Sequence, residues 1–266
     1  MTENGLRYVN ASDMNVYAYC PRLLYLQRVM GLSNIVGHST FKGLMGHAVR
    51  KELSLRQAKI MRLIREKGSA DGILDSELDR ISRDLPHIFR EWWIPDHASL
   101  LGEVKNEVSS EFRILADKMD LMVSEMGYEK ALEYMTPWKI EYSIKSESLM
   151  LKGRVDKIMR RDSLFPVELK TGVPPENVHN GHRLQICSYS MLVEDEFGVM
   201  IPYGMVEYVR VHESRPVLNT EKLRREVLYS RDLILELLDG DLPEVCPHGS
   251  GKKCESCSLM QECYRI

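Results

Sequence analysis

Asp156, Glu168 and Lys170 lie on consecutive stretches in which polar and apolar residues alternate, a pattern typical of paired β-strands. Side chains alternate across a strand, so Glu168 and Lys170 project from one face and a hairpin can bring Asp156 beside them. Two carboxylates supply the hard oxygen ligands that Mg²⁺ or Mn²⁺ prefers. An adjacent ammonium can orient or deprotonate a water molecule and stabilise the charge of a phosphorane. These residue types therefore predict a divalent-cation site suited to phosphodiester hydrolysis.

Alternating Glu and Lys also occur on the solvent-exposed face of ordinary strands, which is the structural interpretation of the same motif. The neighbouring residues 165–167 and Leu169 are apolar, as in a central strand rather than an exposed edge. A charged pair placed there needs a partner or a function. This context favours the cation site.

Two further features favour chemistry, although each alone is commonly structural. His47 lies on a basic helix after Gly43 and Gly46, which would let another backbone approach closely. Gln185 and Tyr189 are four residues apart, so they share one face of the helix that follows the strand of Glu168.

The cysteines near the C-terminal end form a CxxCxxxxxC cluster of Cys254, Cys257 and Cys263, which leaves one position of a four-thiolate site open. Cys246 would complete a local zinc module. Cys20 would instead join the two ends of the chain around an iron-sulfur cluster. Spacing alone does not choose between the two.

The composition bounds the remaining expectations. The 266 residues are 44% hydrophobic and carry a net charge of -3, so we expect a globular protein whose overall charge does not attract polyanions. With no membrane-spanning or signal-like stretch, we expect a cytoplasmic protein in which thiols stay reduced. Cys187 is then best interpreted as a small buried hydrophobe.

Helical periodicity dominates the first half of the chain. Residues 13–31 indicate two short helices that meet at Cys20, with Ser12 capping the first. The helix over 41–67 carries eight basic residues, which form either a solvated face or a stripe that contacts phosphates. Residues 69–137 indicate a helical subdomain or lid, with breaks at Pro86, Pro95 and Gly127.

Strands and helices then alternate. We expect three consecutive strands, a helix, a strand with a short partner, and a last helix, at 138–148, 149–161, 163–170, 176–197, 203–213, 216–218 and 221–238. The chain would divide into an N-terminal helical segment with the first cysteine, a basic helix with His47, a helical insertion, a core and a C-terminal cysteine module, at 1–40, 41–68, 69–137, 138–240 and 241–266.

The motifs together resemble a known family. In order they are CPRLLYL, GLMGH, GRVD, VELKTG, QICSY and CxxCxxxxxC. This series resembles the CRISPR-associated RecB-like nucleases of the Cas-four family and the iron-sulfur nuclease domains of helicase-nucleases such as AddB and Dna-two. The resemblance runs from about Ser12 to the end, apart from the region between His47 and Trp138, which is long for compact members.

The resemblance implies a PD-(D/E)xK fold, with a mixed central sheet flanked by helices and an iron-sulfur module joining the termini. It implies that the catalytic Mg²⁺ or Mn²⁺ is held by His47, Asp156, Glu168 and the carbonyl of Leu169. Lys170 would be the catalytic lysine, and Gln185 and Tyr189 would position DNA and support the site. The cluster, four-iron in first place and two-iron as the alternative, would be bound by Cys20, Cys254, Cys257 and Cys263, with Cys246 spare.

The implied function is a metal-dependent nuclease that trims single-stranded DNA ends or overhangs before the CRISPR integrase inserts them. A repair or recombination nuclease outside CRISPR systems is the runner-up. Two other classes stay open: a catalytically silent iron-sulfur scaffold that binds DNA, and a small redox protein in which the cluster is the function.

Overall fold

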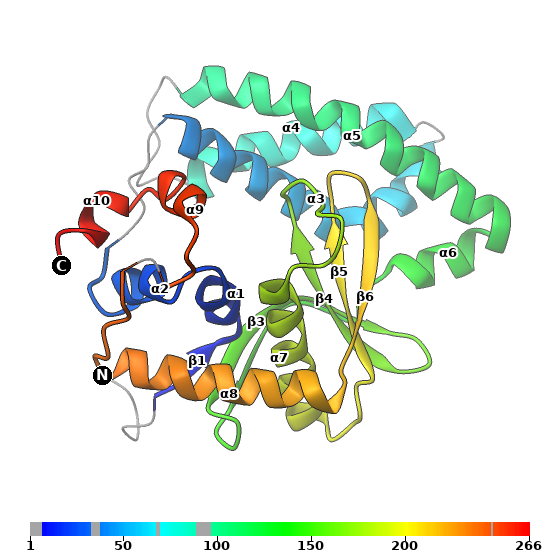
Figure 1. The fold of residues 1–266 in the computed structure, drawn as a ribbon. Helices are drawn as coiled ribbons and strands as arrows, with labels where there is room; N and C mark the ends of the chain where they lie inside the picture. The colour runs from blue at the N-terminus through cyan, green and yellow to red at the C-terminus, as the bar shows by residue number, and fades with distance from the viewer. Residues whose placement is uncertain (1–6, 33–37, 68–69, 89–96, 246) are drawn as a thin grey trace.

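A mixed sheet of six strands lies between helices in the computed structural model, which describes residues 7–32, 38–67, 70–88, 97–245 and 247–266 (Figure 1). The strand order is β1, β3, β4, β5, β6, and β2 also pairs with β3. The β1–β3 and β4–β5 pairs are parallel and the others antiparallel. The strands are β1 (Val9–Asn10), β2 (Lys139–Ser146), β3 (Leu151–Arg160), β4 (Leu164–Lys170), β5 (Tyr203–Tyr208) and β6 (Glu213–Leu218).

The helices of the described ranges precede, interrupt and follow these strands. They are α1 (Ala11–Tyr19), α2 (Pro21–Arg28), α3 (His38–Lys67), α4 (Ala70–Ile88), α5 (His97–Met126), α6 (Tyr128–Met135), α7 (Asn180–Phe197), α8 (Glu221–Leu238), α9 (Gly251–Glu255) and α10 (Met260–Cys263). None of them combines the length and the apolar character that a membrane crossing requires.

The predicted order of elements is confirmed, with corrections at several ends. Ser12 does not cap α1: Asn10 precedes the helix, and its backbone N–H donates to Oδ2 of Asp13 (3.1 Å). Pro86 does not break α4, which continues to Ile88, whereas Gly127 does separate α5 from α6. The helix expected from residue 176 begins at Asn180, and Pro95 lies outside the described residues.

The two edges of β3 are used differently. β2 follows one edge from Leu151 to Ile158. On the other edge β1 pairs only at Leu151 and Lys152, and β4 pairs only over 157–160. In the described chain, residues 153–156 thus have no strand partner on this edge, and β3 and β4 separate just where Asp156 lies.

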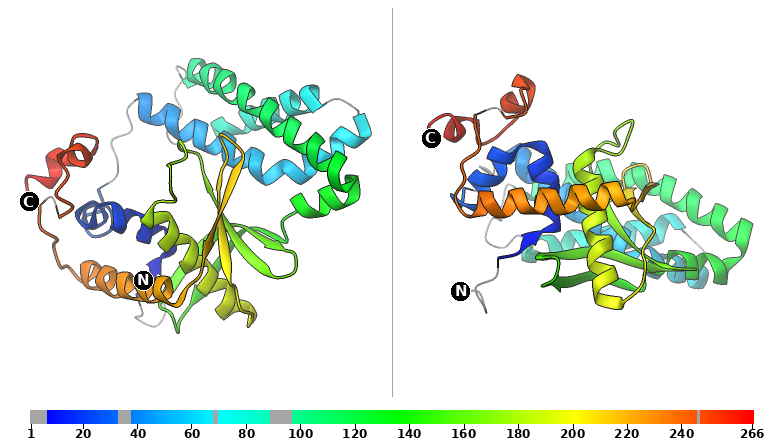
Figure 2. Two further views of the ribbon diagram at one scale, coloured as in Figure 1. Left: turned by 45° about the vertical axis from the view of Figure 1, so that its right-hand side comes forward. Right: turned by 60° about the horizontal axis from the view of Figure 1, so that its bottom comes forward.

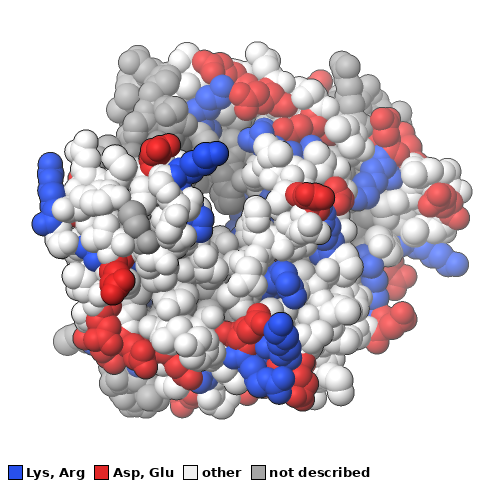
Figure 3. Space-filling model, in the orientation of Figure 1, with Lys and Arg blue, Asp and Glu red and all other residues white. Residues whose placement is uncertain are grey.

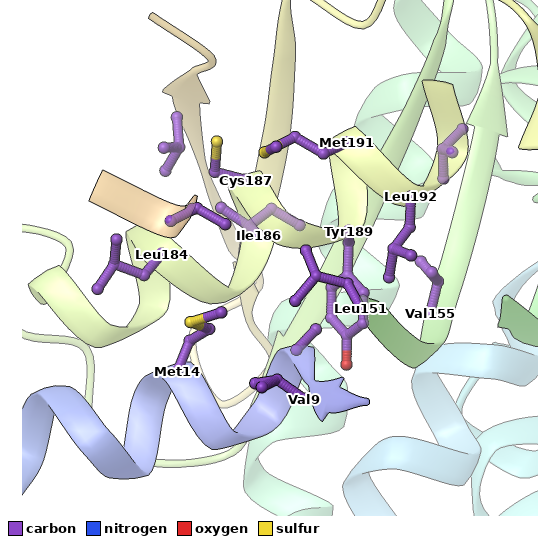
Figure 4. Close-up of a cluster of buried hydrophobic side chains, with 14 of the residues drawn as sticks. Val9, Met14, Leu151, Val155, Leu184, Ile186, Cys187, Tyr189, Met191 and Leu192 are labelled. Carbon is purple, nitrogen blue, oxygen red and sulfur yellow. The ribbon is translucent and has the colours of Figure 1, made fainter. Parts of the chain in front are cut away.

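One face of the sheet is packed by α1, α7 and α8. The side chains of α7 fill this layer, and Figure 4 shows Leu184, Ile186 and Met191 among them together with Met14 of α1. Cys187 is fully buried in the same cluster, and burial raises the pKa of its thiol to about 12. Its predicted role as a buried hydrophobe is confirmed.

The other face is covered in part by α3, which also builds a second core with α4, α5 and α6. Phe165 and Val167 of β4 pack near Leu55 of α3. The second core joins α3 to the helices predicted at 69–137, so this region is a helical layer with its own apolar interior (Figure 2). It contacts the sheet through α3 and also through α5 and α6, for example where Lys118 of α5 donates to the carbonyl of His212 (2.6 Å).

Most of the basic side chains that α3 presents are neutralised inside the protein. Lys42 contacts Glu103 and Glu107 of α5 at 2.7 Å, and Arg50 makes a two-fold hydrogen bond to Glu111. Further pairs join Lys51 to Glu141 and Asp156, Arg56 to Glu52 and Glu77, and Lys59 to Glu77. On the face seen in Figure 3, Lys and Arg alternate with Asp and Glu. Of the two interpretations of the basic residues of α3, these ion pairs disfavour the stripe that contacts phosphates, because α4, α5 and the sheet supply counter-charges.

Gly181 provides a test of the packing of α7 on α1. A Cβ atom at Gly181 would lie 3.0 Å from both Cα and the carbonyl oxygen of Asn15, backbone atoms that cannot move aside cheaply. Gly181→Ala should therefore lower the free energy of unfolding by about 1–3 kcal/mol, measured by urea denaturation. Gly102→Ala, in a helix with open space around it, should instead raise it by about 0.5–1 kcal/mol. Equal effects would contradict this account of the α1–α7 contact.

Candidate active site

Asp156 and Glu168 face each other where β3 and β4 separate. The backbone N–H of Leu169 donates to Oδ2 of Asp156 (2.8 Å), so a carboxylate takes the place of the missing ladder partner. Both side chains are buried, with residue exposures of 5% for Asp156 and 7% for Glu168. Burial raises the pKa of Glu168 to about 7, Lys170 opposes the rise, and Asp156 adds to it. The predicted proximity of the two carboxylates is confirmed.

Lys170 and Gln185 hold Glu168 from two sides. Nζ of Lys170 donates to Oε1 of Glu168 (3.0 Å) and to Oε1 of Gln185 (2.9 Å). Nε2 of Gln185 donates to the same oxygen of Glu168 (2.8 Å) and to the hydroxyl of Tyr189 (3.3 Å). The strand pair and the helix pair predicted from spacing therefore meet in one hydrogen-bonded group.

His47 reaches the same place from α3. Its Nδ1 lies 2.8 Å from the hydroxyl of Thr171, just after β4. Burial lowers the pKa of His47, and Lys51 lowers it further against the opposing charge of Asp156, so the ring is neutral near pH 7.

The expected close backbone approach at Gly43 and Gly46 is wrong. A Cβ at Gly43 would meet nothing within 4 Å, and one at Gly46 would lie 2.7 Å from the guanidinium of Arg50 on the same helix. The small residue at Gly46 thus leaves room for a side chain that crosses to α5, since Arg50 pairs with Glu111.

Two charged residues of the site were not found from the sequence. Lys51, one helical turn after His47, places Nζ 2.7 Å from Oδ1 of Asp156 and 2.9 Å from Oε1 of Glu141. Burial lowers the pKa of Lys51, but Asp156 and Glu141 outweigh it and hold that pKa above its usual value. Two features point to Lys51 and Glu141. Lys51 follows His47 by four residues, and Glu141 stands opposite Asp156 because the residues on either side of it pair with Lys157 and Val155.

The donor set suits a divalent cation in its chemistry. Two buried carboxylates and a neutral imidazole are ligands that Mn²⁺ accepts, and the carboxylates also suit Mg²⁺. Burial, with the like charge of Asp156 adding to it, already raises the pKa of Glu168. As the side chains stand, no three His, Cys, Asp or Glu residues in the described ranges gather closely enough to hold an ion. Lys51 and Lys170 neutralise the carboxylates here.

The four predicted cluster cysteines line a common pocket, although their side chains as they stand are not close enough to hold an ion. Cys20, Cys254, Cys257 and Cys263 line one small pocket between the α1–α2 junction and α9–α10, where the two ends of the chain lie side by side (Figure 2). Cys20, Cys257 and Cys263 are free thiols. Burial raises the pKa of Cys20, with Cys263 and Cys257 adding to the rise.

Polar contacts fasten these ends to each other. Nη2 of Arg22, only 2% exposed, donates to the carbonyls of Cys263 (3.1 Å) and Ile266 (2.7 Å). Lys253 donates to the carbonyl of Tyr19 (3.0 Å). Cys246, the alternative fourth ligand, lies outside the described residues, while His248 lines the same pocket with Nε2 3.9 Å from Sγ of Cys254.

The chain is similar to a known protein family over nearly its whole length. Residues 8–264 match the PD-(D/E)XK nuclease superfamily. The chain belongs to this superfamily. PD-(D/E)XK nucleases depend on divalent metal ions, so the protein is a metal-dependent nuclease, and the mixed sheet with flanking helices agrees with the fold expected for it.

Two curated relatives of this PD-(D/E)XK nuclease bear related names. It is 25% identical over 273 residues to the CRISPR-associated exonuclease Csa1 of Saccharolobus solfataricus, an alignment that covers 98% of this chain and 86% of that protein. It is 29% identical over 142 residues to the CRISPR-associated exonuclease Cas4 of Francisella tularensis subsp. novicida, covering 53% of this chain and 67% of that protein.

Proposed function

We propose that this PD-(D/E)XK nuclease is a deoxyribonuclease that trims single-stranded DNA ends or overhangs for CRISPR adaptation. The observation that carries the proposal is the buried group formed by Asp156, Glu168 and Lys170, in which Gln185 ties Lys170 to Glu168. The names of both relatives support an exonuclease in CRISPR systems. A natural partner would be the integrase complex that receives the trimmed DNA.

Each residue of the centre would have its own role in the reaction. His47, Asp156 and Glu168, with the carbonyl of Leu169, would hold Mg²⁺ or Mn²⁺. When bound, the ion supplies Lewis-acid polarisation of the phosphate and a bound water of lowered pKa.

Lys170 would orient that water and stabilise the negative charge that develops on the phosphate oxygens. Gln185 holds the Lys170 ammonium in place through its side-chain oxygen (2.9 Å). The Tyr189 hydroxyl, which accepts from Gln185, fixes the amide in turn. Because these groups are buried, they need little reorganisation when the substrate binds.

A basic groove supports binding of a nucleic-acid strand next to this centre. It has a volume of about 590 Å³ and runs over the ends of β1, β2 and β3 as far as Tyr189. Its basic residues are Lys145, Lys152 and Arg154. Within the described ranges Lys145 and Lys152 form no ion pair, so their charges are available to phosphates in a way that those of Lys42 and Lys59 are not.

We further propose that the cysteine pocket binds an iron-sulfur cluster, with four irons as the first choice and two as the alternative. The four cysteines that share one apolar pocket with Leu23, Leu26 and Met260 support it. Such a cluster would close a very long loop between Cys20 and the C-terminal cysteines, and thus stabilise the fold.

The nuclease proposal predicts that Glu168→Ala and Lys170→Ala each lower metal-dependent cleavage by about 10³-fold or more, since each removes a group of the buried centre. The measurement is release of label from end-labelled single-stranded and overhang DNA with Mg²⁺ or Mn²⁺, under anaerobic conditions. Circular dichroism should show an unchanged fold. Glu147→Ala, in the exposed β2–β3 turn, is the control and should cleave like the wild type. Cleavage retained in either active-site variant would contradict the proposal.

The groove predicts a selective loss of DNA affinity. Lys145→Ala and Lys152→Ala together should weaken single-stranded DNA binding and reduce the slope of log affinity against log salt by about 0.7 for each phosphate that is no longer neutralised. Fluorescence anisotropy across a salt series measures both. The matched pair Lys42→Ala and Lys59→Ala should leave the slope unchanged, because these lysines are held by Glu103 and Glu77. A larger loss of DNA affinity in the Lys42→Ala and Lys59→Ala pair would refute the proposal that the DNA strand lies in this groove.

The cluster proposal predicts that Cys20→Ser bleaches the anaerobically purified protein. Visible absorbance and iron content should fall together, and the unfolding midpoint should drop because the two ends are no longer joined. Cys187→Ser, in the main core, should keep its colour even if it is less stable. Undiminished iron in Cys20→Ser, or zinc in place of iron in the wild type, would favour a local module with Cys246 instead.

A further inference from the structure

Lys51 occupies a position between two carboxylates of the active centre. Its ammonium lies 2.7 Å from Asp156 and 2.9 Å from Glu141, distances typical of close ion pairs. The side chain is 28% exposed, while those of Asp156 and Glu141 are 8% and 20% exposed. A single positive charge thus bridges two partly or wholly buried acids.

Glu141 reaches this place through an unusual backbone. Its φ of 49° is in the left-handed region, which costs a residue with a Cβ about 1–3 kcal/mol. The register around it is regular, since Ile140 pairs with Lys157 and Tyr142 with Val155, so Glu141 stands opposite Asp156. Arg154 of β3 pairs with the second oxygen of Glu141 and holds the carboxylate from outside.

Each oxygen of Asp156 has one partner from the protein as a result. Oδ2 accepts the N–H of Leu169 and Oδ1 forms an ion pair with Lys51, so each oxygen keeps a lone pair that can face a metal ion. A cation beside Oδ1 offsets the cost of burying this acid, and its removal would leave the charge uncompensated. Lys51 supplies that cation from the same helix that carries His47, one turn earlier.

We propose that Lys51 is a positioning residue that fills a second cation position, so that the centre takes one divalent ion and not two. This inference rests on the proposed function, because it assumes that Asp156 and Glu168 bind the metal. Glu141 would hold Lys51 in place, and Lys51 would keep Asp156 turned toward the metal. Without Lys51, Asp156 and Glu141 would be two facing carboxylates with the oxygen ligands that a further divalent ion requires.

Calorimetric titration of Mn²⁺ into protein free of divalent ions, with no DNA present, tests the proposal. The wild type should bind one ion at the centre, and Lys51→Ala and Lys51→Met should each bind two. Electron paramagnetic resonance of the loaded Lys51 variants should show a spin-coupled manganese pair that the wild type lacks. Lys51→Arg, which restores the positive charge, should return the stoichiometry to one.

Two control variants make the result specific. Lys51→Ala combined with Glu141→Ala should bind one ion again, because the second acid is gone. Lys59→Ala, on the same helix but paired with Glu77, should behave like the wild type. One ion in both Lys51→Ala and Lys51→Met would overturn the inference while leaving the proposed function intact. A wild type that binds no Mn²⁺ and cleaves without divalent ions would overturn the proposed function and this inference with it.

Discussion

Two carboxylates that face each other inside the protein impose the constraint on which this structure depends. Asp156 and Glu168 are withdrawn from water at the point where β3 and β4 separate, and like charges so placed repel each other strongly at low dielectric. Each therefore needs hydrogen-bond donors and positive charge from elsewhere in the chain. Lys170, Gln185, Lys51 and the N–H of Leu169 provide them.

These donors come from elements that are far apart in sequence, so the surrounding helices and strands must hold them together. The long helix α3 crosses to the sheet with His47 and Lys51, and the helical layer of α4, α5 and α6 anchors that helix. Salt bridges such as Arg50 with Glu111 fix its rotation. On the opposite face of β3, Lys157 pairs with Glu207 and with Ser54 of α3, a second polar link between helix and sheet.

The sequence predicted the parts of the site that depend on local periodicity. Alternation along β4 placed Glu168 and Lys170 on one face, and helical spacing placed Gln185 with Tyr189. The meeting of Cys20 with the C-terminal cysteines was open on spacing and is favoured by the pocket that they share. Local pattern was sufficient for the strand pair and the helix pair because each lies within a single element.

What the sequence did not predict depends on contacts between distant segments. The charges of α3 looked available to phosphates because the acids that neutralise them, such as Glu103 and Glu111, lie on a helix far along the chain. Glu141 was not predicted as a site residue, because the alternation of side chains along a strand assumes an extended backbone and Glu141 has a positive φ. The capping residue Asn10 was not predicted, because Asn and Ser are about equally good helix caps and the sequence does not choose between Asn10 and Ser12.

The Asp156–Glu168 pair is assigned as the site of the divalent cation, and the free energy of unfolding with and without Mn²⁺ tests this assignment most directly. An ion that binds only the folded state adds about 2.7 kcal/mol at one hundred times its dissociation constant. The wild type should gain stability that rises with Mn²⁺ concentration, and a variant with both Asp156→Asn and Glu168→Gln should gain almost none. An equal gain in the two proteins would mean that the ion binds elsewhere, and it would contradict the assignment of this buried pair as the metal centre.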